Sequence, residues 1–218
     1  MQINVPHGIL LYNSLSTLNT EWYEMTETKK YRGRPKTLNK NHVVEIAMQA
    51  YWHEGPTEVS MNSLCQRAGV SKPSLYREFG NEDGLACAAL ENYVQSVMAK
   101  VIEKLKGDGS FADKIGRLVF IATEGTRHEN GCLFVKMRAT KLSLGVKTQS
   151  MIAETENMAL EAYTQFLDEA KENRDWSGTF PVTLGAQYLH AQIGLAMAQR
   201  ARGEDPTAVL KLALSIFE

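Results

Sequence analysis

The sequence has few cysteines, few prolines and no excess of charge of either sign. Its 218 residues include three Cys and six Pro, and 24 Lys and Arg stand against 25 Asp and Glu. Cys65, Cys87 and Cys132 form no CxxC pair, which argues against a disulfide framework and a thiolate zinc site and favours a reducing, cytoplasmic compartment. A net charge of −1 provides no global field that would attract nucleic acid, so any basic surface must be local.

Several chemical and targeting signatures are also missing. No GxSxG, Walker, GxGxxG or HExxH motif occurs, and the ExxxH pair of Glu124 and His128 has no second histidine at ligand spacing. We therefore expect no catalytic residue, no cofactor and no metal. The apolar residues 9–11 are too few for a signal sequence. Residues 176–199 lack charge over a length that could span a bilayer, but they contain Pro181 and His190, so we interpret them as a buried helix and expect no membrane partner.

Apolar residues recur at helical spacing from Asn39 to the end of the chain, and no stretch alternates as a strand would. This pattern predicts an all-α fold. Glycine, proline and capping residues divide it into helices at 39–54, 60–68, 71–79, 82–106, 110–127, 131–141, 147–172, 179–202 and 206–217. Residues 1–36 lack the pattern and are expected to form a flexible extension, with Met25 as a second candidate start.

The second and third expected helices have the length and turn chemistry of a helix-turn-helix. Ser60 and Ser71 stand where N-caps are needed, and Gly69 ends the first of the two helices. With Leu75 and Phe79 turned to the core, a period of about 100° per residue directs the opposite face outward. Pro73, Ser74 and Arg77 lie on that face, with Tyr76 on its flank and Lys72 near the helix start, and we expect all five to meet DNA. Ser60, at the start of the preceding helix, is a further expected DNA contact.

These residue types suit contacts with a DNA major groove. Arg77 can donate two hydrogen bonds to a guanine edge, and Lys72 can neutralise a phosphate. A basic arm precedes them, because residues 29–40 contain six cations and no acid. Within the arm, Arg32 and Arg34 either contact DNA or belong to a solvated tail. By itself, a glycine turn between two helices is also compatible with a simple αα-corner.

Residues 60–81 closely resemble the DNA-binding signature of the TetR family of bacterial regulators, chiefly in the string Ala68-Gly69-Val70-Ser71-Lys72-Pro73-Ser74-Leu75-Tyr76-Arg77-Glu78-Phe79-Gly80-Asn81. The resemblance covers about residues 39–90, and Gly33-Arg34-Pro35 is similar to the arm of many members. It implies a three-helix DNA-binding domain at 37–85, followed by a helical domain at 86–218 that binds an effector and dimerises. It also implies repression that a small molecule releases.

The chain departs from many members of that family at two acidic positions. Glu78 stands where a histidine is frequent, and Glu82 stands where many relatives have lysine. One phosphate contact of the family is therefore not carried over to this chain. We expect its operator to differ and its affinity to depend more on the arm.

The residues 179–202 carry two stripes, one apolar and one of small residues. The second stripe would allow another helix to approach closely and consists of Gln187, Ala191, Gly194 and Ala198. Together with the helix at 147–172, whose Met151, Met158, Ala162 and Phe166 share one side, it predicts a four-helix interface of a homodimer. Packing within one chain is the alternative. A dimer would place two recognition helices on a palindromic operator in double-stranded DNA.

Methionine and aromatic residues of the second domain could line a cavity for a small-molecule effector. The candidates are Phe134, Tyr163, Trp176 and Tyr188, with His128 and His190 as polar groups that could orient a ligand. Cys132 is expected in the first turn of a helix, which would favour its thiolate. The Gly131-Cys132-Leu133 string is similar to that of several TetR-like repressors, some of which sense electrophiles or oxidants through the cysteine. Covalent sensing and a simple packing role both remain open.

Three classes of function follow from these patterns. The first is a dimeric, effector-responsive regulator that binds a specific DNA sequence. The second is a helical enzyme or ligand carrier with an accessory domain that resembles a DNA-binding domain. The third is an architectural protein that binds any DNA through the basic arm, against which the net charge of −1 argues.

Overall fold

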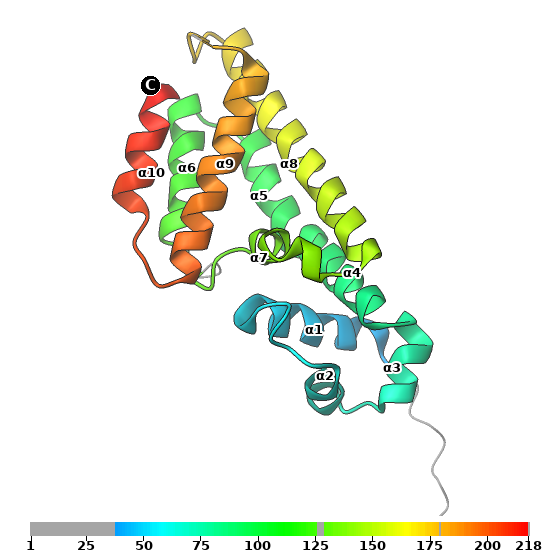
Figure 1. The fold of residues 1–218 in the computed structure, drawn as a ribbon. Helices are drawn as coiled ribbons and strands as arrows, with labels where there is room; N and C mark the ends of the chain where they lie inside the picture. The colour runs from blue at the N-terminus through cyan, green and yellow to red at the C-terminus, as the bar shows by residue number, and fades with distance from the viewer. Residues whose placement is uncertain (1–37, 126–128, 179, 218) are drawn as a thin grey trace, which may run out of the picture. The chain divides into compact units, whose positions relative to one another are not determined.

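The computed structural model of this chain describes residues 38–125, 129–178 and 180–217. Within these ranges every regular element is a helix, as the apolar periodicity predicts (Figure 1). The fold class is therefore confirmed. The expected extension at 1–36, with Arg32 and Arg34, lies outside the described residues, and so does His128.

Three helices form the N-terminal end: α1 (Lys40–Glu54), α2 (Met61–Ala68) and α3 (Lys72–Phe79). The caps form as the sequence predicts, because the Ser60 hydroxyl accepts a hydrogen bond from the Ser63 N–H and the Ser71 hydroxyl accepts one from the Ser74 N–H. Gly69 ends α2 in the left-handed region, at φ 64°. Leu75 is fully buried under α3, and this anchors the helix to the core.

The helix expected at 82–106 is one continuous run with a defect in its middle. It consists of α4 (Glu82–Tyr93), a π-helical segment (Val94–Met98) and α5 (Ala99–Lys106). The Ser96 hydroxyl donates to the Asn92 carbonyl at 2.6 Å within this stretch. Such π segments are rare, and they often occur at functional sites.

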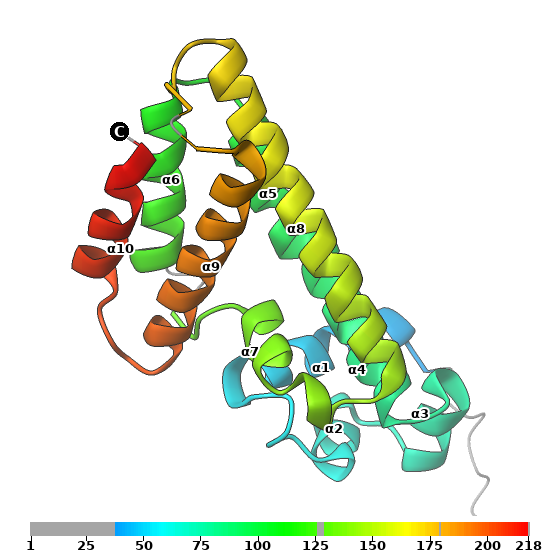
Figure 2. The same cartoon turned by 45° about the horizontal axis from the view of Figure 1, so that its top comes forward.

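The remaining helices are α6 (Phe111–Thr123), α7 (Leu133–Ala139), α8 (Val146–Glu172), α9 (Val182–Ala201) and α10 (Thr207–Leu214). Both views show α6, α9 and α10 side by side, while α8 runs along α9 and on to α4 (Figures 1 and 2). Short 3₁₀ turns follow α7 and α10. A single core extends from α1 to the C-terminal helix, so the expected boundary between residues 85 and 86 falls inside α4 and stays a prediction.

The uncharged stretch at 176–199 is only partly helical, because α9 begins at Val182. Trp176 lies before the helix in a cluster of aromatic rings, where it stacks with Phe111 at 6.2 Å between centroids. The expected buried helix has an exposed side, since Leu184 and Leu195 on α9 are about half exposed. None of the described helices is long and apolar enough to cross a membrane.

Candidate nucleic-acid interface and internal cavity

The outer face of α3 presents the residues that the helical period directs outward. Lys72, Pro73 and Arg77 are exposed, and Ser74 and Tyr76 are half-buried. Because Leu75 and Phe79 hold the opposite face in the core, these five side chains share one surface of the helix. The sequence and the structure agree on this arrangement.

Polar groups along this face support one another without being buried. The Ser71 hydroxyl donates to the Ser74 hydroxyl at 2.9 Å, and Arg77 Nη2 lies 3.4 Å from the same oxygen. Lys72 Nζ lies 5.7 Å from the centre of the Tyr76 ring. Lys72 lies at the start of α3 and Arg77 near its end, with the hydroxyls of Ser74 and Tyr76 between them. These groups form a surface suited to phosphates and base edges.

Glu78 and Glu82, the two acidic residues at which the sequence differs from many TetR-family members, lie at the end of α3 and the start of α4. Glu78 forms an ion pair with Lys40 at 3.6 Å, and the Tyr76 hydroxyl donates to Glu82 at 3.4 Å. Each acid thus pairs with a neighbouring donor, Glu78 with Lys40 and Glu82 with Tyr76. Ser60, another predicted contact, is exposed at the start of α2, where its hydroxyl serves as the N-cap.

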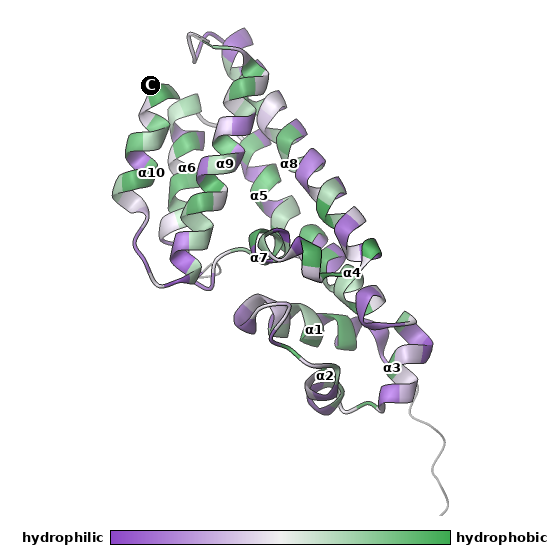
Figure 3. Ribbon diagram, in the orientation of Figure 1, coloured by the Kyte–Doolittle hydropathy of each residue, from purple (hydrophilic) through white to green (hydrophobic). Residues whose placement is uncertain are grey.

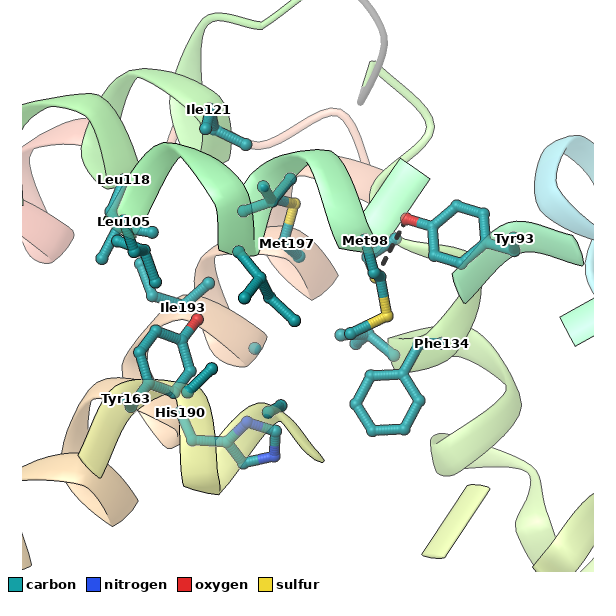
Figure 4. Close-up of a pocket in the computed structure, with 17 residues that line it drawn as sticks. Tyr93, Met98, Leu105, Leu118, Ile121, Phe134, Tyr163, His190, Ile193 and Met197 are labelled. Atoms are coloured by element: carbon teal, nitrogen blue, oxygen red, sulfur yellow. Dashed lines mark hydrogen bonds between the residues drawn. The ribbon is translucent and has the colours of Figure 1, made fainter. Parts of the chain in front are cut away.

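An internal cavity of about 80 Å³ lies among α4, α5, α6, α7, α8 and α9 (Figure 4). Three of the predicted effector residues line it, namely Cys132, Phe134 and Tyr163. His190 and Tyr93 add the other polar side chains, and the rest of the wall is apolar. Its volume is small beside the roughly 300 Å³ or more of a typical ligand site.

Cys132 is the N-cap residue of α7 and is buried, with 9% of its surface exposed. The Tyr93 hydroxyl donates to its Sγ atom at 3.2 Å. Burial raises the pKa of the Cys132 thiol, although the Tyr93 hydroxyl and the N–H groups of Val135 and Phe134 oppose this change. The expectation of a favoured thiolate is therefore wrong for this state of the protein, because desolvation outweighs the helix N-terminus.

A charged cluster closes the cavity beside His190. Arg138 donates to the His190 ring and, at 3.2 Å, to Glu156. Burial and the Arg138 charge lower the pKa of His190, while Glu156 opposes them, so the imidazole is neutral and accepts the hydrogen bond. Gly194 makes room for this arrangement, since a Cβ atom there would approach Arg138 Nη2 to 2.9 Å.

The other two predicted effector residues, Trp176 and Tyr188, do not line the cavity. Trp176 packs with Phe111 and Phe180, and the Tyr188 hydroxyl donates to the Ala213 carbonyl at 3.0 Å. They belong to an aromatic cluster that joins α9 to the C-terminal 3₁₀ turn. Their residue types made Trp176 and Tyr188 candidates for a cavity wall. The sequence did not indicate which side chains they would contact in the fold.

The turn before Cys132 is bonded directly to α1. The Trp52 indole N–H donates to the Gly131 carbonyl at 2.9 Å, and Lys136 Nζ donates to the Trp52 carbonyl at 2.6 Å. The Trp52 ring meets the Tyr93 ring edge to face, with centroids 4.9 Å apart. The cavity wall and α1 thus share one set of contacts, which the sequence pattern does not indicate because 79 residues separate Trp52 from Gly131.

A second connection joins the start of α4 to the start of α8. Asp83 accepts hydrogen bonds from the N–H groups of Lys147 and Thr148, each at 2.9 Å, and from the Thr148 hydroxyl at 2.7 Å. Although burial acts to raise it, these hydrogen bonds hold the pKa of Asp83 below its usual value. Asp83 therefore acts as the N-terminal cap of α8 from another helix, a role with no local signature.

The predicted dimer stripe on α9 is divided by the structure. Gln187 and Ala191 are exposed and Ala198 is half-buried, whereas Gly194 is buried under Arg138. Of the expected partners on α8, Ala162 and Phe166 are buried within the chain, and Met151 and Met158 are half-buried. Figure 3 shows hydrophobic residues along the ribbons of α9 and α10. The exposed large apolar side chains on these helices and the turn after α10 are Leu184, Leu195, Val209, Leu212 and Ile216.

Residues 43–89 match the family model described as "Bacterial regulatory proteins, tetR family". Over 72 residues the chain is 38% identical to the HTH-type transcriptional repressor ComR of Escherichia coli, a match that covers 33% of this chain and 34% of ComR. It is 25% identical over 140 residues to the HTH-type transcriptional repressor NemR of the same species, covering 62% of this chain and 69% of NemR. The chain thus matches only about a third of the length of ComR.

Solved structures share the fold over a longer span. The reduced form of E. coli NemR has a TM-score of 0.68 at 23% identity, over 82% of this chain and 95% of NemR. A cysteine mutant of the TetR-family regulator CifR, solved with a 26-base-pair operator, has a TM-score of 0.67 at 18% identity, over 85% of this chain and 100% of CifR. Residues 43–89 therefore carry the DNA-binding signature of the TetR family, and the described helices share their fold with solved regulators of that family.

Proposed function

We propose that this protein is a dimeric transcriptional regulator that binds a specific DNA sequence, represses transcription and is released by a small molecule in its internal cavity. The observation that carries the proposal is the outer face of α3, where Lys72, Pro73 and Arg77 are exposed above a buried Leu75. ComR and NemR are repressors by name, and CifR was solved with operator DNA. These relatives support the same role for this chain.

Recognition would follow the helix-turn-helix pattern. The α3 helix enters the major groove, Arg77 reads a guanine, and Lys72 and Ser74 contact phosphate or base edges. Ser60 lies beside the N-terminus of α2, whose free N–H groups favour a phosphate. The basic arm with Arg32 and Arg34 would add affinity that falls with rising salt.

Dimerisation would bury the apolar face that α9 and α10 leave exposed. Leu184, Ala191, Leu195 and Ala198 recur at helical spacing on α9, and Leu212 is 76% exposed on α10. A two-fold axis along this face would join two helices from each subunit. We therefore revise the predicted interface, keeping Gln187, Ala191 and Ala198 and replacing α8 with α10.

Release of DNA would begin at the cavity and end at α1 and α4. A molecule that enlarges the cavity displaces Tyr93 or the turn at Gly131, and both contact Trp52. Modification of Cys132 would act at the same place, because its Sγ atom lies 3.2 Å from the Tyr93 hydroxyl. Either event weakens DNA binding only as far as it favours the conformation that fits DNA poorly.

The proposal is tested by fluorescence anisotropy with the duplex just upstream of the protein's own reading frame and a scrambled duplex, at low and moderate salt. We expect tight binding to the first duplex that persists at moderate salt. Equal binding to both, lost as salt rises, would indicate an architectural protein. No binding to any genomic duplex would favour the enzyme or ligand carrier, whose DNA-binding-like domain is accessory.

Two further parts of the proposal concern location and chemistry. A regulator of bacterial genes acts in the cytoplasm, which agrees with three free cysteines in the sequence. The regulator needs no catalytic residue and no cofactor. Cell fractionation with tagged protein, followed by recovery of bound DNA fragments, tests both statements together.

A further inference from the structure

The cavity contains a buried hydroxyl group that forms no hydrogen bond with any residue in the described part of the chain. Tyr163 on α8 is 91% buried, since only 9% of its surface is exposed. Figure 4 shows its hydroxyl directed toward the other lining side chains. Among the residues that the structure describes, none forms a hydrogen bond with this hydroxyl, and burial raises its pKa so that it remains protonated.

The other polar side chains of the cavity are already engaged. The Tyr93 hydroxyl donates to Cys132, and His190 is held by Arg138 beside Glu156. Tyr163 is thus the polar group that remains to orient a ligand. A buried donor without an acceptor is costly, because it has lost water without gaining a replacement.

We propose that the cavity binds a small, mainly apolar molecule with one carbonyl-type oxygen, which accepts a hydrogen bond from the Tyr163 hydroxyl. The apolar wall provided by Met98, Ile193 and Met197 accepts the body of such a molecule. Its volume of about 80 Å³ limits the size. An apolar cavity of roughly 150 Å³ accepts benzene, so this one suits a ring of five atoms or a chain of similar bulk.

This inference rests on the proposed function, in which the ligand of the cavity is the effector, but binding can be measured without DNA. Cyclopentanone and methylenecyclopentane are suitable probes, because they have nearly the same shape and only the first carries a carbonyl oxygen. Methionine labelled with ¹³C at its methyl group gives the readout by NMR, since Met98 and Met197 line the cavity. The proteins compared are the full-length wild type, Tyr163→Phe and the control Tyr188→Phe.

We expect the wild type to bind the ketone more tightly than the hydrocarbon, with shifts at Met98 and Met197. Tyr163→Phe should weaken ketone binding by roughly five- to tenfold, the effect of one hydrogen bond, and leave hydrocarbon binding unchanged. Tyr188→Phe should change neither, because its hydroxyl bonds to Ala213 outside the cavity. Without ligand, Tyr163→Phe should melt at the same temperature as the wild type or higher, and Tyr188→Phe should melt lower.

Three results would overturn the inference. They are the absence of ketone-induced shifts at Met98 and Met197, an equal loss of affinity for both probes in Tyr163→Phe, and a lower melting temperature for ligand-free Tyr163→Phe than for the wild type. Adding operator duplex separates this inference from the proposed function. Ketone that binds the cavity without releasing DNA would contradict the effector role and leave the assignment of Tyr163 standing.

Discussion

The polar groups on the outer face of α3 and those of the internal cavity differ in their hydrogen-bond partners and in their exposure to water. On α3, hydrogen bonds join residues three apart in the sequence, such as Ser71 with Ser74, and the groups stay in contact with water. In the cavity, Tyr93 bonds to Cys132 across 39 residues, and the bond is buried. Exposed groups on α3 can therefore be removed at little cost to folding, whereas removing a hydrogen-bonded group around the cavity costs stability.

The largest expected effect is on assembly, from a surface outside both regions. Leu212→Glu on α10 should weaken the dimer by about 4 kcal/mol, because two leucines lose their burial at a two-fold interface. Sedimentation velocity should show monomers with unchanged helical content by circular dichroism. Leu142→Glu is the control, since Leu142 is 94% exposed on the turn after α7. A dimer that survives Leu212→Glu would exclude the α9 and α10 face.

Gly131→Ala tests the junction of the cavity with α1. Gly131 has φ +74°, and a Cβ atom would lie 2.6 Å from the Met197 carbonyl oxygen, so we expect a loss of about 3 kcal/mol in urea unfolding. Gly203→Ala shares the backbone strain, at φ +77°, but meets no atom within 4 Å. The control should cost only about 1 kcal/mol. Equal losses would mean that the contact with α9 carries no energy.

Arg77→Ala tests the assignment of the outer face of α3 to DNA. Removing this exposed side chain should weaken specific binding by about 2 kcal/mol and leave thermal stability unchanged. Lys106→Ala removes the same charge from the end of α5 and should leave the anisotropy titration unaltered. Identical titrations for the two variants would contradict base readout by Arg77.

Asp83→Asn tests the cap that joins α4 to α8. We expect a loss of about 1–2 kcal/mol at neutral pH, because a charged acceptor of three hydrogen bonds is replaced. The pKa of Asp83 is lowered in the folded protein, so its contribution is present above the unfolded value of about 3.9 and is lost as pH falls through the folded value. The difference in the free energy of unfolding between the wild type and Asp83→Asn should accordingly disappear at acidic pH.

The matched variant for this cap is Glu82→Gln, one residue earlier in α4. The Glu82 carboxylate is exposed and accepts one long hydrogen bond, from Tyr76 at 3.4 Å. Its replacement should alter unfolding by less than about 0.5 kcal/mol. A stability gap for Asp83→Asn that is independent of pH would refute the charged cap.

Cys132→Ser should have a small effect on folding, below about 1 kcal/mol, because the side chain nearly keeps its size and keeps its neighbour Tyr93. Burial raises the pKa of the thiol, so alkylation by iodoacetamide should be slow at neutral pH and faster in alkali. If Cys132 is a sensor, alkylation followed by mass spectrometry will track the release of DNA. Release that persists in Cys132→Ser but not in Cys87→Ser would assign sensing to another cysteine.

Local features of this protein were predictable residue by residue. Ser60 and Ser71 cap their helices as expected, because an N-cap forms with a backbone N–H only three residues ahead. The outward positions of Lys72 and Arg77 followed in the same way, from the helical period and two apolar anchors.

Features that depend on neighbouring helices were not predictable. Ala191 and Gly194 were assigned to one stripe, yet the first is exposed and the second is covered by Arg138. The apolar side of α8 packs against α4 and α9, so our proposed interface pairs α9 with α10 in place of α8. Periodicity identifies an apolar face but contains no information about which surface will cover it.

The sequence by itself determined the helical fold, the helix-turn-helix and the side chains that α3 presents, because these depend on interactions within one or two helical turns. Only the tertiary structure decided that Tyr163 shares a cavity with Cys132, that Trp52 is bonded to Gly131, and that Asp83 caps α8. Those contacts join residues far apart in the chain. They form where helices pack, and packing is set by the shapes of all the surfaces that meet.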